Sequence, residues 1–263
     1  MDGEKNMENS IGYIDNNKLQ EVIDKLSELE IKSKSKSEYL LDTKRVPRVT
    51  EILSAMIAEP GLMNWANNLG WKRISYKQFM KEAADKGTYT HLAIERFLKG
   101  KDVDISTFGI MNYKIQESVE SAFDAFKFWW SVIHTNHTNI ELVLSEETLM
   151  CPYFGGTCDC VLKVDDEYWL VDFKTSNHMN YNYTLQLAAY RYLLKTVKDI
   201  DVSKCMVLKL SKNFEGYKTY ELNMNEEEHL DFIEKCTQTF MILSTAYRMR
   251  LDTTDIYEMI FKN

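Results

Sequence analysis

The sequence is poor in cysteine, and the five that it has do not form a recognisable pattern. They lie at Cys151, Cys158, Cys160, Cys205 and Cys236, and no two of them make a CxxC pair. This odd, unpaired set argues against a disulfide framework, a zinc site and a four-cysteine iron–sulfur cluster. Reduced thiols fit best, so we expect a cytoplasmic protein.

Long hydrophobic runs are also missing. The longest, such as residues 128–133, are far shorter than the roughly 20 residues that a membrane-spanning helix needs. The acidic N-terminus lacks the basic-then-apolar pattern of a signal peptide. We therefore expect no membrane partner, although an apolar fraction of 44% is enough to build a core.

An excess of positive charge is the third absence. The 263 residues contain 32 Lys and Arg against 40 Asp and Glu, a net charge of −8. Such a chain repels polyphosphate at long range, so nucleic-acid binding would need a local basic patch or a bound cation. The charged residues are interspersed, which excludes a chain that is disordered throughout.

The chain divides near residue 45. In residues 1–45, apolar side chains at Leu19, Val22, Ile23, Leu26 and Leu29 have helical spacing and precede the Lys-Ser repeat at 32–37. We interpret 1–45 as an appendage, an N-terminal helix with a charged linker, and 46–263 as the main domain. The apolar stripe either packs on that domain or docks a protein partner.

Residues 46–263 have the pattern of an α/β domain. Helical periodicity predicts helices at 50–58, 62–69, 76–99 and 113–134, and an alternating pattern predicts strands at 140–149, 157–164 and 168–173. A helix at 181–197, strands at 204–210 and 217–222 and a helix at 225–250 follow. We expect a central mixed sheet flanked by helices, with the aromatic residues of 123–130 in the core.

Two predicted strands carry the candidate catalytic and metal-binding residues. Asp159 lies in one strand, and Asp172 and Lys174 share a face of the next. If Asp165-Asp166 forms a tight hairpin turn, opposing residues have numbers that sum to 331, which places Asp159 opposite Asp172. Their Cβ atoms would then lie roughly 5 Å apart.

Two facing carboxylates repel each other unless a cation lies between them. Such a pair is a natural set of ligands for a hard divalent cation. Lys174 would lie beside it, where an ammonium can hold an attacking water or offset the charge of a pentacovalent phosphate. Alternatively, Asp172 and Lys174 form an ordinary ion pair on a solvent-facing edge strand.

The segments Gly156-Thr157-x-Asp159 and Asp172-x-Lys174 resemble motifs of the PD-(D/E)XK nuclease superfamily. The order of the further motifs is similar to its RecB-like exonuclease branch, which includes the mitochondrial genome maintenance exonuclease and phage exonucleases. These motifs are Gly87-Thr88-x-x-His91-x-x-x-Glu95, Glu146 or Glu147, Gln186-x-x-x-Tyr190 and the opening at residues 48–53. The resemblance spans about residues 46–222 and implies a restriction-endonuclease-like core.

The resemblance also implies roles for individual residues. Asp159, Asp172, His91 and the carbonyl of Phe173 would bind Mg²⁺ or Mn²⁺, and Asp159, Asp172 and Lys174 would be catalytic. Glu95 and Glu146 would support the ligands, although Glu95 has Arg96 and Lys99 as alternative partners. Contacts to nucleic acid would come from Thr175, Gln186, Tyr190 and Arg191, with Tyr181 and Tyr183 as stacking candidates.

The sequence departs from the cysteine pattern of many branch members. No cysteine precedes His91, and only Cys205 and Cys236 follow Tyr190, so we expect no iron–sulfur cluster; no nucleotide cofactor is expected either. The resemblance implies a Mg²⁺- or Mn²⁺-dependent DNA exonuclease acting on single-stranded ends in replication, repair or recombination. It would act in the host cytoplasm if its source is viral.

Two other functions remain open from the sequence. One is a structure-specific or duplex-end nuclease, which needs a channel or an arch. The other is a non-cleaving protein that retains the fold and binds nucleic acid or a protein partner.

Overall fold

The computed structural model describes residues 39–41, 44–58, 60–176 and 178–261. The predicted N-terminal helix therefore lies outside the described residues. The elements in chain order are β1 (Leu40–Leu41), β2 (Lys44–Arg45), α2 (Val49–Met56), α3 (Pro60–Trp71), α4 (Tyr76–Leu98), the 3₁₀ helix η1 (Ile105–Phe108), α5 (Tyr113–Asn136), β3 (Ile140–Met150), β4 (Gly155–Val164), β5 (Glu167–Lys174), α6 (Tyr181–Lys198), β6 (Val202–Leu210), β7 (Tyr217–Asn223) and α7 (Glu227–Phe261).

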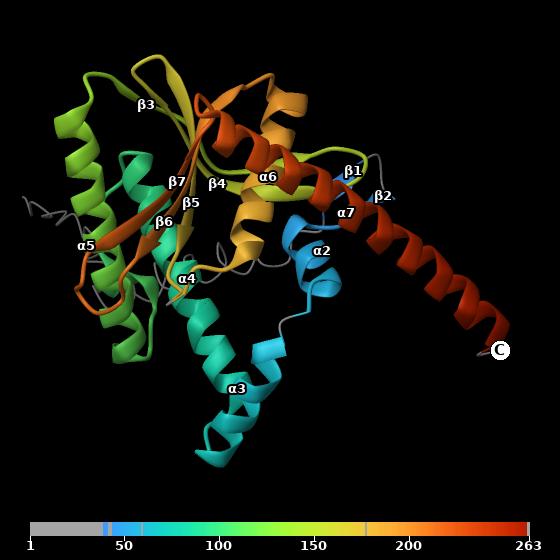
Figure 1. The fold of residues 1–263 in the computed structure, drawn as a ribbon. Helices are drawn as coiled ribbons and strands as arrows, with labels where there is room; N and C mark the ends of the chain where they lie inside the picture. The colour runs from blue at the N-terminus through green and yellow to red at the C-terminus, as the bar shows by residue number, and fades with distance from the viewer. Residues whose placement is uncertain (1–38, 42–43, 59, 177, 262–263) are drawn as a thin grey trace, which may run out of the picture.

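The centre of the fold is a mixed five-stranded sheet, as predicted. Its strand order is β3-β4-β5-β6-β7, and only the β5–β6 pair is parallel. Parallel neighbours need a crossover connection, and α6 provides it. This crossover brings α6 over the end of β5, while α4 and α5 cover the opposite face (Figure 1).

The β4–β5 hairpin has the register that the sequence predicted. All five pairs, from Val164↔Glu167 to Cys160↔Val171, have residue numbers that sum to 331. The turn is stabilised from outside the hairpin, because the Asp165 carboxylate accepts hydrogen bonds from the backbone N–H groups of Thr138 and Asn139. A hydrogen bond with His137, followed by those from Thr138 and Asn139, holds the pKa of Asp165 below its ordinary value.

Apolar side chains form one cluster on each side of the sheet. The first joins the sheet to α2, α6 and α7, and the second joins it to α4, η1 and α5. Phe123, Phe126 and Trp129 are buried in the second cluster, whereas Phe128 is exposed and its ring contacts Tyr217. The aromatic segment is therefore core, apart from its one outward-facing ring.

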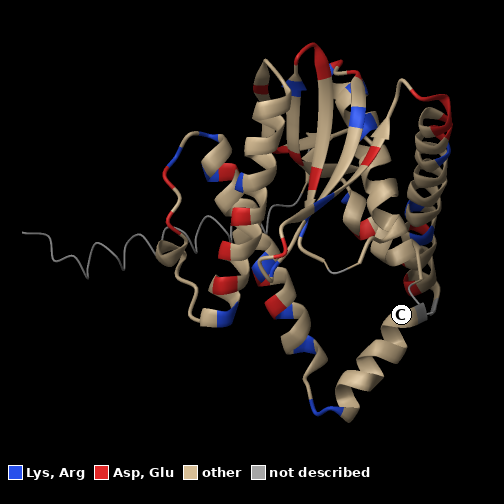
Figure 2. Cartoon of the chain, turned by 60° about the vertical axis from the view of Figure 1, so that its left-hand side comes forward, with Lys and Arg blue, Asp and Glu red and all other residues tan. Residues whose placement is uncertain are grey.

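The elements agree with the predicted ranges except at the ends of the chain. Helix α7 continues to residue 261, and residues 251–260 are all exposed, whereas apolar periodicity predicted an end near 250. None of the helices in the described ranges combines the length and apolarity that a membrane crossing requires. Acidic and basic residues are interspersed along the helices and loops (Figure 2).

One close contact fixes α6 against β4. A Cβ added to Gly156 would lie 2.4 Å from Cε1 of Tyr190, a ring that is itself buried. Only a residue without a side chain allows this approach.

We predict that Gly156→Ala lowers the free energy of unfolding by about 1–3 kcal/mol, because the added methyl group overpacks the helix–sheet contact. Denaturant unfolding measures this change. Gly70→Ala is the control: Gly70 lies in α3 with nothing near its Cβ position, so the substitution should be neutral or stabilising. Equal stability of Gly156→Ala and wild type would contradict the close-contact interpretation.

Candidate active site

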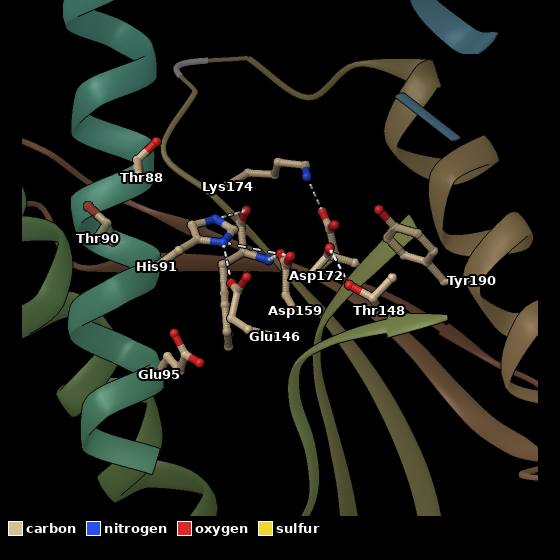
Figure 3. Close-up of polar contacts among 12 residues, drawn as sticks. Thr88, Thr90, His91, Glu95, Glu146, Thr148, Asp159, Asp172, Lys174 and Tyr190 are labelled. Atoms are coloured by element: carbon tan, nitrogen blue, oxygen red, sulfur yellow. Dashed lines mark hydrogen bonds and ion pairs between the residues drawn. The ribbon is translucent and has the colours of Figure 1, made fainter. Parts of the chain in front are cut away.

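The predicted catalytic and metal-binding residues lie between α4 and α6, at one end of the sheet. His91 extends from α4, Glu146 from β3, Asp159 from β4, and Asp172 and Lys174 from β5 (Figure 3). Regular β4–β5 pairing ends at Cys160↔Val171, one position before the two aspartates. The hairpin register therefore delivers both carboxylates to the place where the strands separate.

Asp159 replaces the missing strand pairing with a side-chain bond. Its Oδ2 accepts a hydrogen bond of 2.8 Å from the backbone N–H of Phe173. The carbonyl oxygen of Phe173 lies 3.1 Å from Nε2 of His91. Asp159, Phe173 and His91 thus form a connected chain of polar contacts from β4 through β5 to α4.

His91 has an acceptor at each ring nitrogen. Its Nδ1 lies 2.9 Å from Oε1 of Glu146 and 3.6 Å from Oδ1 of Asp159, and its Nε2 faces the Phe173 carbonyl. Both nitrogens therefore donate, which is the imidazolium form. Burial opposes this charge, but the carboxylates of Asp159 and Glu146 outweigh it and raise the pKa of His91 to about 9.

Backbone conformation distinguishes Glu146 from Glu147, which the sequence left as alternatives. Glu146 has a φ of 51°, in the left-handed region, and its side chain reaches His91. Glu147 instead forms an ion pair with Lys198 of α6. Such strain in a residue with a side chain is often retained at functional positions.

Asp172 and Lys174 form the second half of the site. Asp172 is 1% exposed, and its Oδ2 lies 2.6 Å from Nζ of Lys174. Burial raises the pKa of Asp172 to about 6 against the opposing effect of Lys174. Apart from this ion pair, neither carboxylate oxygen has a hydrogen-bond partner among the described residues.

The ammonium group of Lys174 is held between an acid and an aromatic ring. Its Nζ lies 5.0 Å from the ring centre of Tyr183. Burial lowers the pKa of Lys174, but the carboxylates of Asp172 and Asp159 outweigh that effect, so the pKa lies above its ordinary value. Lys174 is therefore charged at neutral pH.

The donor set fits a hard divalent cation. Ligand atoms of His91, Glu146 and Asp159 all lie within 4.8 Å of one another, and the unsatisfied oxygens of Asp172 add acceptors nearby. Carboxylate oxygens with imidazole suit Mg²⁺ or Mn²⁺. Glu146, for which the sequence predicted a supporting role, belongs to the compact group, whereas Asp172 lies outside it.

The other predicted residues differ in their placement. Gln186 donates to the hydroxyl of Tyr190 at 3.0 Å, and both side chains are buried beside the site. Burial raises the pKa of Tyr190 well above its ordinary value. Thr175 directly follows Lys174, and its hydroxyl lies 3.8 Å from the Cβ position of Gly87 in α4.

Two predicted residues form ion pairs in other directions. Arg191 contacts Glu234 of α7 at 2.7 Å, on the side of α6 that packs against that helix. Glu95 contacts Lys99 at 2.6 Å, one of the two surface partners that the sequence offered. Tyr39, which the sequence analysis did not single out, donates or accepts a hydrogen bond with Thr157 two residues before Asp159.

Comparison with known proteins identifies the family. Residues 68–254, which include all these polar residues except Tyr39, match the PD-(D/E)XK nuclease superfamily. The chain belongs to this superfamily. PD-(D/E)XK nucleases use divalent metals, in agreement with the donor set described above. No curated protein matches the sequence.

Two solved structures are similar to this PD-(D/E)XK nuclease, with low TM-scores. The alkaline exonuclease LHK-Exo from Laribacter hongkongensis has 12% identity, covers 80% of this chain and 93% of its own, and gives a TM-score of 0.37. LHK-Exo in complex with dAMP has 15% identity, covers 66% of this chain and 91% of its own, and gives a TM-score of 0.31. The family assignment therefore rests on the sequence match.

We predict that His91 of the metal-free protein titrates with a pKa of about 9, and that Glu146→Gln lowers this value. The substitution removes one of the two carboxylates that stabilise the imidazolium. NMR titration of labelled histidine, assigned with His91→Gln, measures both values. Glu141→Gln, an exposed acid on the same strand, is the control.

Magnesium should lower the apparent pKa of His91 in the same titration, because a metal-bound imidazole must be neutral. A wild-type value near the ordinary 6.5, or the same value in Glu146→Gln and wild type, would contradict the charge assignment.

Proposed function

We propose that the protein is a Mg²⁺- or Mn²⁺-dependent DNA exonuclease of the RecB-like branch that acts on single-stranded ends in replication, repair or recombination. The observation that carries the proposal is that a candidate metal-binding group lies directly beside a buried acid–lysine pair. The acid–imidazole group at His91, Glu146 and Asp159 lies beside the buried Asp172–Lys174 pair, within the segment that matches the superfamily. The motif resemblance described above supports the branch and the preference for single strands.

Asp159, Asp172, His91 and the Phe173 carbonyl are the proposed metal ligands. A divalent cation held there would supply Lewis-acid polarisation of the phosphodiester and would lower the pKa of a bound water. Glu146 orients His91 through its bond to Nδ1, as outer carboxylates do in many metal sites. The hydrogen bond from Phe173 fixes one oxygen of Asp159 and leaves the other directed toward His91.

Lys174 is the proposed partner of the attacking water. Its ammonium group donates hydrogen bonds to that water and offsets the negative charge that develops on the phosphate. Contacts with the Asp172 carboxylate and the Tyr183 ring keep Nζ in place, so the group needs little reorganisation. Thr175, Gln186 and Tyr190 are proposed to contact the strand near the cleaved bond, with Arg191 as a more distant contact.

The five cysteines support a reducing compartment. All five are buried and unpaired, so we propose a cytoplasmic location, without an iron–sulfur cluster. The proposed mechanism requires no nucleotide cofactor.

We predict that the wild type degrades linear single-stranded DNA in Mg²⁺ or Mn²⁺ but not in EDTA, and that Lys174→Ala lowers the rate by at least about 100-fold. Strands labelled at the 5′ or the 3′ end, resolved on a gel, measure the loss and give the polarity. Lys163→Ala is the matched control, because Lys163 lies on β4 near the hairpin turn and pairs with exposed Asp166.

Substrate controls separate the alternatives. Faster loss of duplex ends than of single strands would favour a duplex-end nuclease, and cleavage of circular single strands would show endonuclease action. A folded wild type that leaves every substrate intact in both metals would contradict the enzymatic proposal and favour a binding role.

We propose that residues 1–45 are an appendage to the nuclease domain 46–263. Within that appendage, Tyr39 is buried and contacts Thr157, so a functional deletion should spare it.

We predict that a chain lacking residues 1–38 keeps its cleavage rate within about twofold. Circular dichroism and the labelled-strand assay on the deleted and complete chains measure folding and activity. Loss of folding in the deleted chain would show that the removed segment belongs to the core.

A further inference from the structure

A groove opens beside the proposed active site. Helix α3 and the first turns of α4 project from the body as a helical hairpin (Figure 1). The hairpin, Ser176, residues 178–180 and the start of α6 line a cavity of about 670 Å³. Its lining combines Trp65, Phe79 and Tyr183 with Lys86 and Lys212.

Two aromatic rings of this groove, Trp65 and Phe79, lie outside both core clusters. Phe79 is 43% exposed, and Trp65 is half-buried against Tyr76 and Phe79, with ring centres 5.6 and 5.1 Å away. These edge-on contacts fix Trp65 without covering it completely. Rings that are fixed and partly open offer faces on which unpaired bases can stack.

Positive charge also gathers along the groove, where Lys86 and Lys212 are lining residues. Burial, together with repulsion from Lys86 and Lys209, lowers the pKa of Lys212, so the three ammonium groups lie close enough to interact. Neither Lys86 nor Lys212 has an ion pair with another described residue. One acid, Glu82, also lines the groove, and its carboxylate accepts a hydrogen bond from Gln78.

The lysine lining continues into a second hollow. This hollow, of about 210 Å³, shares Ser176 and Lys212 with the first and is lined by Lys209 and Lys218 at the β6–β7 turn. It contains one acid, Glu215. The two hollows together form a track that is lined by aromatic rings and by lysines.

The track leads to the proposed reaction centre. Tyr183 lines the groove and also holds the Lys174 ammonium over its ring. Lys86 precedes Gly87, which faces the Thr175 hydroxyl. A strand in the groove would therefore pass beside Tyr183, whose ring contacts the Lys174 ammonium group.

We propose that this groove binds a single strand of DNA, with bases against Trp65, Phe79 and Tyr183 and phosphates at Lys86, Lys209 and Lys212. The proposal rests on the nuclease function proposed above and assigns the path of its substrate. A single strand is required, because a duplex hides the base faces that the rings would contact. An acidic peptide would match the lysines but would leave the rings unused.

Binding in EDTA tests the groove without requiring cleavage. We expect Trp65→Ala to bind a fluorescent oligothymidylate about tenfold more weakly than wild type, measured by anisotropy with the complete chain. Trp71→Ala is the matched control, because Trp71 lies on the same helix, is 81% exposed and does not line the groove. Equal loss in the two variants, or no loss in Trp65→Ala, would overturn the proposal.

A salt series provides a second measurement that does not depend on the packing of Trp65. Lys86→Ala and Lys212→Ala should each reduce the slope of log affinity against log salt by about 0.7, the value for one phosphate contact on a single strand. Lys81→Ala, an exposed lysine on the same helix as Lys86, should leave the slope unchanged. Unchanged slopes in both groove variants would overturn the proposal, as would stronger competition by polyglutamate than by unlabelled oligothymidylate.

The two proposals fail in distinguishable ways. If DNA is cleaved but the groove variants bind as wild type does, the groove assignment is wrong and the nuclease remains. If no DNA is cleaved but Trp65 and the lysines contribute as expected, the groove stands as a nucleic-acid site and the nuclease fails. A wild type that binds no single strand overturns the groove.

Discussion

The hydrogen bond from the Phe173 N–H to Asp159 is the constraint on which the site depends. It joins β4 to β5 at the point where their regular pairing has ended and β5 continues along β6. It sets the direction of the neighbouring Phe173 carbonyl, which orients His91, and His91 in turn contacts Glu146. Four elements of the fold are thereby tied to a single buried carboxylate, and the low dielectric around it strengthens its hydrogen bond to Phe173.

The sequence predicted the sheet and the register of the β4–β5 hairpin because both depend on local rules. Alternation identified the strands, and a two-residue turn fixed the hairpin register. Asp165-Asp166 is a weak turn signal on its own, and bonds from Thr138 and Asn139 supply what the turn lacks. Those bonds come from a segment more than twenty residues away, so the prediction was right without containing the full reason.

Other features of the site depend on contacts that no spacing rule contains. The choice of Glu146 over Glu147 follows from a left-handed backbone at one residue of β3. The direction of Arg191 follows from the docking of α7, whose Glu234 attracts it. Trp65 and Phe79 gain a common surface only when α3 folds back on α4, and the sequence pointed instead to Tyr181 and Tyr183, of which Tyr183 lines the groove.

The burial of every thiol has a practical consequence. Burial raises the pKa of Cys158, Cys160 and Cys205, and neither Cys151 nor Cys236 is open to solvent. Because only exposed thiolates react readily, alkylating reagents should modify the native chain slowly, at the rate at which its parts open. A single cysteine introduced on the outer face of α3 would therefore be labelled selectively, without removal of the native cysteines. Slow reaction of the native thiols would in turn report local unfolding.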